Sequence, residues 1–200
     1  MMRTWSDGDG RGRLRLLLPG ELTAEQVGLY TDIVRDAGVD KGEVVSEDGT
    51  LLGPFNSFLT VPSVGVHIRH MARALPRCGA LPPMLYETAV LTTGSRWRAT
   101  YMLEVHRRRG QQAGLTGELI DQLCDPALEE LIGPDDISAV WRYCRELVDR
   151  RAVSDVTFRC TEDVVGAEGL VLVTMLVGFY SFVGGILAAF EVPGRAVDER

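Results

Sequence analysis

The residues best equipped for chemistry lie between positions 81 and 106, in the stretch LPPMLYETAVLTTGSRWRATYMLEVH. This stretch holds two glutamates, Glu87 and Glu104, and one of the three histidines of the chain, His106. A histidine beside a carboxylate can take up and release a proton near neutral pH. Proton transfer is therefore the first functional hypothesis, and the spacing decides which carboxylate takes part in it.

Glu87 and His106 are separated by 19 positions. On one straight helix they would lie ~28 Å apart along the axis, at ~1.5 Å per residue. The two side chains can therefore meet only if the chain folds back between them. Gly94-Ser95 permits such a break, because glycine ends helices readily. We expect one helix over about 83–93 and a second over about 97–113.

The phase of the second helix separates its side chains into two sets at about 100° per residue. One face carries Ala99, Met102 and His106, and the other carries Trp97, Tyr101 and Glu104. His106 therefore faces an apolar wall, and Glu104 points away from it. We predict Glu87 and His106 as the catalytic pair, and either could instead be structural: His106 bonded to a backbone carbonyl, Glu87 capping a helix or pairing with an arginine.

The candidate substrate-binding residues are His67, Trp97, Ala99, Tyr101 and Met102. His67 shares a helical stripe with Ile68 and Met71, which favours a place in a pocket. Trp97 and Tyr101 could instead serve packing or an interface. His67 and His70 are three residues apart, which suits a metal, but no third ligand clusters with them. We predict no metal and no cofactor.

The pattern of apolar residues predicts an all-α fold with one minor N-terminal hairpin. Helical stripes cover about 23–35, 62–76, 83–93, 97–113, 135–150 and 154–166. Thr23 and Gln26 form a capping-box signature, and Asp48-Gly49 between apolar runs indicates a hairpin over 44–52. Residues 1–13 are polar and glycine-rich, so we expect them to be disordered. Residues 14–200 are expected to form a single domain.

The segment 169–190 carries no charged residue over 22 positions, which is long enough to span a bilayer. Glu168 and Glu191 close it, and Gly178, Gly184 and Gly185 interrupt it. A core helix, or two short ones, hidden inside an oligomer fits this pattern better. We therefore predict no membrane partner.

Composition excludes some classes of function. The formal net charge is −7, from 21 basic and 28 acidic residues, which disfavours binding to nucleic acid. The four cysteines are far apart and form no CxxC pair. No basic stretch followed by an apolar one opens the chain. These features favour reduced thiols and a cytoplasmic location.

Several segments together resemble the carboxymuconolactone decarboxylase family, which includes the AhpD-like branch. The matching runs, over about residues 22–195, are DGTLLGPFNSFL, LPPMLYETAVLTT, RWRATYMLEVHRRRGQQAGLTGELI, VSDVTF and LVGFYSFVGGILAAFEVP. The resemblance implies an all-helical fold, a homo-oligomer (dimer, trimer or hexamer) and an active site near subunit contacts.

The resemblance also shows what this chain lacks. In the peroxidase branch the motif is Glu-x11-Cys-x2-Cys-x3-His, whose ends match Glu87 and His106. Its two cysteine positions match Ala99 and Met102, which cannot supply a thiolate. Decarboxylase-like relatives often carry Tyr-Glu-Trp where this chain has Tyr101-Met102-Leu103. A thiol peroxidase is therefore not expected.

We expect a cofactor-independent acid–base enzyme, a lyase or isomerase of the decarboxylase-like kind. It would act on a small carbonyl, lactone or carboxylate substrate by decarboxylation, isomerisation, cyclisation or dehydration, and a place in a biosynthetic pathway is plausible. The alternative is a non-catalytic ligand-binding or scaffold oligomer that has lost the family activity. A diverged alkylhydroperoxidase is a third and weaker option.

Overall fold

The computed structural model describes residues 12–38 and 41–194. In this part the regular elements are helices, and an isolated antiparallel bridge joins Val45 to Leu51. The predicted all-α class is therefore confirmed, and the hairpin is reduced to that one bridge. Most of the segment predicted to be disordered lies outside the described residues. Arg13 lies within them, and its backbone N–H donates to the Phe190 carbonyl over 2.7 Å.

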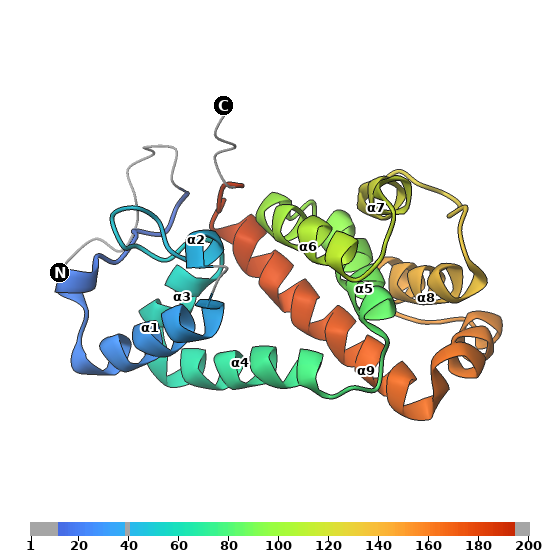
Figure 1. The fold of residues 1–200 in the computed structure, drawn as a ribbon, viewed down its shortest axis with the longest axis horizontal. Helices are drawn as coiled ribbons and strands as arrows, with labels where there is room; N and C mark the ends of the chain where they lie inside the picture. Colours follow the sequence, from blue (N-terminus) through green and yellow to red (C-terminus); the bar gives the residue numbers. More distant parts are fainter. Residues whose placement is uncertain (1–11, 39–40, 195–200) are drawn as a thin grey trace. The chain divides into compact units, whose positions relative to one another are not determined.

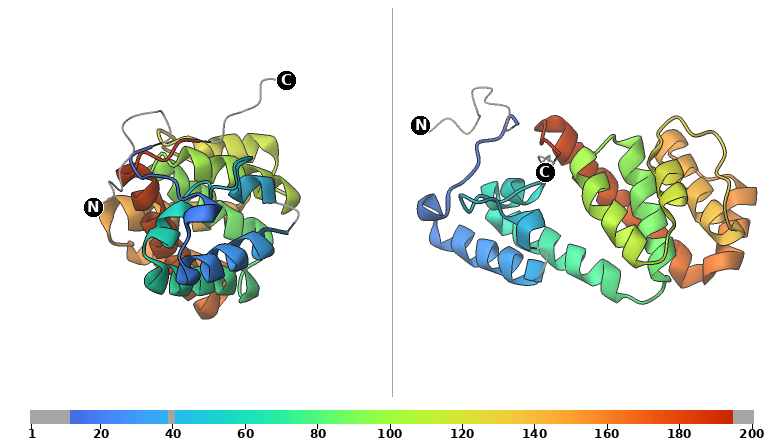
Figure 2. Two further views of the ribbon diagram at one scale, coloured as in Figure 1. Left: turned by 90° about the vertical axis from the view of Figure 1, so that its left-hand side faces the viewer. Right: turned by 45° about the horizontal axis from the view of Figure 1, so that its top comes forward.

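The chain divides by its internal contacts into two compact units. The N-terminal unit takes the residues up to Ala74 together with those from Ile186 onward, and the central unit is Leu75–Gly185. Figures 1 and 2 show the helices of both units. The expectation of one domain over residues 14–200 stays a prediction.

The described residues of the N-terminal unit form α1 (Ala24–Ala37), α2 (Lys41–Val44), α3 (Phe55–Thr60), α4 (Pro62–Ala74) and the last residues of α9. Helix α1 begins with the predicted capping box, in which Thr23 and Gln26 exchange side-chain hydrogen bonds to each other's backbone N–H. The sequence pattern missed the short helices α2 and α3, because four and six residues are too few to show a helical period.

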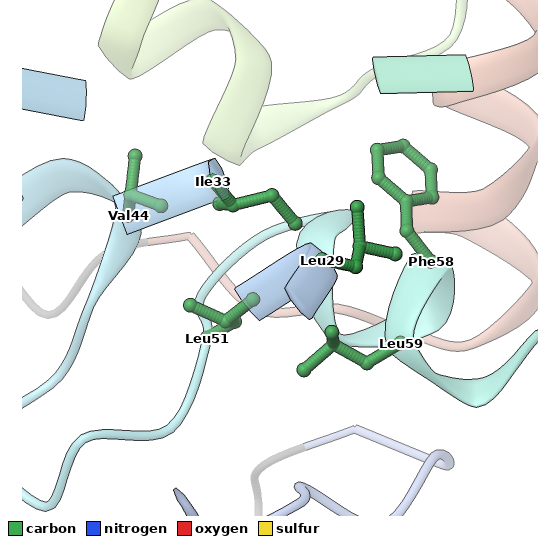
Figure 3. Close-up of a cluster of buried hydrophobic side chains, with 6 residues drawn as sticks. All are labelled: Leu29, Ile33, Val44, Leu51, Phe58 and Leu59. Carbon is green, nitrogen blue, oxygen red and sulfur yellow. The ribbon is translucent and has the colours of Figure 1, made fainter. Parts of the chain in front are cut away.

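A compact apolar cluster forms the core of the N-terminal unit (Figure 3). Its members come from α1, α2, α3 and the bridge: Leu29, Ile33, Val44, Leu51, Phe58 and Leu59. Gly65 of α4 lies so close to this cluster that an added Cβ would stand 2.3 Å from the Phe58 carbonyl oxygen. The glycine therefore allows α4 to cross α3 at short range.

The central unit contains α5 (Pro83–Arg96), α6 (Thr100–Gln112), α7 (Gly117–Cys124), α8 (Asp135–Arg150) and most of α9 (Asp155–Ala189). Helix α5 packs against α6, α7 and α8, and residues 87–95 are buried without interruption. The hydroxyls of Thr88, Thr92 and Thr93 donate to carbonyls four residues earlier, and Ser95 to one three residues earlier. A polar helix can be buried here because its own backbone satisfies its side chains.

The break between α5 and α6 lies three residues later than the sequence indicated. Helix α5 continues through Gly94 to Arg96, and the chain turns over residues 97–99 with Arg98 at φ 50°. Gly94 is kept inside the helix by close packing, since an added Cβ would lie 2.9 Å from the Met102 sulfur. Gly94 therefore allows close contact between α5 and α6 and does not end α5.

Helix α9 joins the two segments that the sequence separated. The junction is Gly166, whose φ of 69° and ψ of 174° are not helical, and a glycine tolerates this conformation. By length and a mean hydropathy of 2.2 the helix could cross a membrane, which is weak evidence. More than half of its most apolar window, 56 %, is buried, as in the core helix of a soluble protein.

Candidate acid–base site

Glu87 on α5 and His106 on α6 meet directly. The distance from Glu87 Oε2 to His106 Nδ1 is 2.7 Å. The two side chains are 9 % and 6 % exposed, respectively. The turn at residues 97–99 brings them together, because it reverses the chain and sets α6 beside α5. The predicted partners are therefore paired, and a buried pair of this length is a charge-assisted hydrogen bond when the carboxyl is ionised.

The second ring nitrogen of His106 remains available. Nε2 makes no hydrogen bond to a described residue. With Nδ1 held by Glu87, this arrangement matches a base that is oriented by a carboxylate and works through its other nitrogen.

Two tyrosines complete the site, and the sequence analysis assigned neither to it. The Tyr180 ring of α9 stands edge-to-face against the His106 ring, with centroids 5.1 Å apart and an interplanar angle of 88°. The hydroxyl of Tyr180 lies 3.4 Å from that of Tyr86, which directly precedes Glu87 on α5. Burial raises the pKa of Tyr86 to about 12 and that of Tyr180 well above 10.0. Both phenols therefore stay protonated at neutral pH.

The predicted apolar wall is buried but differently arranged. Ala99 precedes the first residue of α6, and Met102 lies in its first turn, packed over Gly94. Tyr101, expected on the outer face, is buried as well. A substrate-binding role for Ala99, Tyr101 and Met102 stays a prediction.

Trp97 packs against α9 in the central unit, whereas His67 lies in the N-terminal unit. Trp97 packs over Gly184 of α9, where an added Cβ would stand 2.6 Å from the indole Cγ, so packing accounts for this residue. His67 is exposed on α4 in the N-terminal unit. Its ring stands against that of His70 with centroids 6.3 Å apart. Substrate contacts by either residue remain predictions.

None of the four cysteines contacts the acid–base pair. The described contacts of His106 are the Glu87 carboxylate and the Tyr180 ring. All four cysteines are free. Burial raises the pKa of Cys124 to about 11 and that of Cys144 above its ordinary value, which makes both thiols poor nucleophiles. Cys78 and Cys160 are exposed.

Other features of the described residues do not extend the site. A cavity of about 350 Å³ lies between α8 and the first turns of α9, lined by residues such as Arg142, Cys160 and Asp163. It includes neither Glu87 nor His106. Within 12–38 and 41–194, no group of three or more His, Cys, Asp or Glu residues could hold a metal ion.

A search of solved structures connects this geometry to a known fold. The structure is similar to that of a protein of unknown function from Agrobacterium tumefaciens, provisionally named as antioxidant defence protein AhpD. The TM-score is 0.59 at 13 % identity, over 70 % of this chain and 97 % of the other. The chain has an AhpD-like fold. The AhpD-like likeness rests on structure alone, since no family model and no curated protein matches the sequence.

The tyrosines could have been suspected from the sequence. Tyr180 carries a hydroxyl inside an apolar run of 22 residues, and a buried tyrosine usually places its O–H against a partner. Tyr86 is the neighbour of a candidate catalytic glutamate. What the sequence could not provide is the register of α9 against α5, which brings the two hydroxyls together.

Proposed function

We propose that the protein is a cofactor-independent acid–base enzyme that acts on a small carbonyl, lactone or carboxylate substrate. The observation that supports this function is the buried 2.7 Å contact between Glu87 and His106, together with a free Nε2. A general base needs an orienting partner and an open nitrogen within reach of substrate. The AhpD-like fold is compatible with an enzyme but does not select this chemistry.

The proposed first step is removal of a proton from carbon. Glu87 accepts a hydrogen bond from the Nδ1–H of His106, which leaves the lone pair of Nε2 free. Nε2 takes the proton from a carbon next to a carbonyl, and the carbon–hydrogen electron pair moves to the carbonyl oxygen as an enolate. The imidazolium that forms is stabilised by the adjacent carboxylate.

The same pair can complete several net reactions. Return of the proton from Nε2 to a different carbon gives an isomerisation. In a substrate whose carboxyl group lies β to a carbonyl, Nε2 can instead take the proton of the carboxylic acid, after which CO₂ leaves and the electron pair of the broken carbon–carbon bond moves to the carbonyl oxygen. The imidazolium then protonates the enolate carbon. We propose the decarboxylase-like outcome as the leading one, as one step of a biosynthetic pathway.

The rival function is a non-catalytic ligand-binding or scaffold protein. Ala99 and Met102, which stand where the peroxidase motif has thiols, are compatible with it. The pairing of Glu87 with His106 favours the enzyme, because two buried polar groups could be replaced by apolar side chains if only packing were required.

Deuterium exchange tests the proposed function without knowing the natural substrate. A panel of small β-keto acids, 1,3-diketones and lactones is incubated in D₂O, and loss of the α-proton is followed by NMR. We expect exchange above the buffer rate, reduced about 10²- to 10⁴-fold in His106→Gln. His70→Gln, an exposed histidine outside the site, is the matched control and should exchange like wild type. Equal rates in all three proteins, or none above buffer, would favour the scaffold.

We propose further that the protein works as a homo-oligomer in the cytoplasm. Three large apolar side chains on one face of α9 are 43–54 % exposed: Val171, Met175 and Phe182. Gly178 lies on the same face with open space around its Cα, which permits close approach of a second copy. Light scattering should report a dimer, trimer or hexamer that Met175→Glu dissociates, and a wild-type monomer would contradict the proposal.

A further inference from the structure

The hydroxyls of Tyr86 and Tyr180 make only a long, weak hydrogen bond with each other. Their O···O distance is 3.4 Å, whereas a good O–H···O hydrogen bond measures about 2.7–2.8 Å. Two phenols carry two protons, and a contact between them uses only one. At least one O–H donor is therefore left for a third group, and the long contact lets both hydroxyls turn towards a better acceptor.

The position of this donor pair relates it to the acid–base pair. Tyr86 precedes Glu87 on α5, and the Tyr180 ring packs against the His106 ring. A substrate that presents a carbon to His106 Nε2 can therefore place its carbonyl oxygen towards the same side of the unit. One oxygen anion can stand ~2.6 Å from both hydroxyls, the length expected for O–H···O⁻ bonds.

We propose that Tyr86 and Tyr180 form an oxyanion site that binds an enolate or phenolate oxygen beside the Glu87–His106 pair. This inference rests on the proposed function, because it supplies the group that receives the negative charge when Nε2 removes a proton. The two hydroxyls donate hydrogen bonds without transferring their protons. Donors aimed at developing charge in a buried site usually contribute more to catalysis than any other single feature.

The surrounding charges and burial suit this role. Burial is the main cause that raises the pKa of Tyr86 to about 12; the hydrogen bond with Tyr180 and the charge of Arg109 oppose this rise, and the Glu87 charge adds to it. Burial is also the main cause that raises the pKa of Tyr180. Both phenols thus stay protonated, and can donate hydrogen bonds, at every pH at which a histidine could act as base. The positive charge of Arg109 acts on both tyrosines and favours an anion placed near them, whereas the negative charge of Glu87 opposes it.

Binding of 4-nitrophenol tests the oxyanion site directly, because the yellow phenolate form reports an occupied site by its absorbance. Wild-type protein should bind the probe as phenolate, and Tyr86→Phe and Tyr180→Phe should each weaken binding about tenfold. Tyr143→Phe is the matched control. Its hydroxyl also bonds a hydroxyl of α9, Thr174, over 2.7 Å, and its loss should leave probe binding unchanged.

A second measurement covers variants that fold poorly. The chain has five tyrosines, and wild-type protein labelled at tyrosine Cζ should show two resonances that shift when the probe is added. Absence of binding, equal loss in Tyr143→Phe, or no shift of two tyrosine resonances would overturn the oxyanion site.

The outcomes separate the two proposals. If the probe binds through Tyr86 and Tyr180 but no substrate exchanges deuterium, the acid–base function fails and the oxyanion site stands. If deuterium exchange depends on His106 but the probe ignores both tyrosines, only the oxyanion site fails. His106→Gln should lose exchange and keep phenolate binding.

Discussion

Removing the Glu87 carboxylate should destabilise the protein, because it leaves the buried Nδ1–H of His106 without an acceptor. In Glu87→Ala the Nδ1–H of His106 loses its 2.7 Å partner in a side chain that is 6 % exposed. A hydrogen bond to a charged group contributes about 1.5–3 kcal/mol. Breaking a buried pair by deleting one partner costs about 3–5 kcal/mol. We expect a loss near 3 kcal/mol, where these two ranges meet.

Glu87→Gln separates the charge from the hydrogen bond. The amide oxygen can still accept from Nδ1–H in the same place, so the expected loss is about 1 kcal/mol. Both values come from urea unfolding at neutral pH, in which the midpoint should fall and the slope should stay unchanged. The order, with alanine clearly worse than glutamine, follows from the unpaired buried donor.

A double-mutant cycle with His106→Ala isolates the pair from the cavities that truncation creates. The coupling energy should be about 1.5–3 kcal/mol, because each single variant already destroys the same hydrogen bond. Losses that add to within about 0.5 kcal/mol would mean that the two side chains do not interact. That result would refute the reasoning on which the site is built.

Two further perturbations test other parts of the structure. Gly65→Ala should destabilise the protein by about 1–3 kcal/mol, because the new methyl meets the Phe58 carbonyl oxygen. Gly28→Ala, with nothing within 4 Å, should stabilise α1 by about 0.5–1 kcal/mol; equal effects in urea unfolding would refute the close crossing. Burial alone would raise the pKa of Glu146, but hydrogen bonds from Ser154 and Thr157 outweigh it and lower that pKa below 4.5. The stability that wild type holds over Glu146→Gln should therefore be present above pH 4.5 and fade as the pH falls below it; a pH-independent difference would contradict this.

The fold could be predicted from sequence where the local pattern was long and clear. Helix α8 has the predicted bounds of 135–150, and the capping box opens α1 as expected. Glycine was the main source of error. Gly94 looks like a helix break and is instead a contact with α6, whereas Gly166 is the true kink within α9. Only the packed neighbours distinguish these two uses of the same residue.

The candidate site was half predictable. The spacing from Glu87 to His106 and the need for a reversal between them led to two side chains that the structure places in contact. The sequence could have raised Tyr86 and Tyr180 as single candidates but could not bring their hydroxyls together, because helical phase relates residues within one helix and not residues on different helices. His67, which its helical stripe places in a pocket, has an exposed side chain in the N-terminal unit, and its role in substrate binding stays a prediction.

The central claim is that Glu87 holds the Nδ1–H of His106 and leaves Nε2 as the working base. The measurement that tests it most directly is ¹⁵N NMR of the His106 ring, which distinguishes protonated from unprotonated ring nitrogens. We predict that neutral His106 carries its proton on Nδ1 in wild type, with an unprotonated Nε2. A proton on Nε2, with Nδ1 accepting from a protonated Glu87, would contradict the account, since that tautomer has no free lone pair with which to remove a proton.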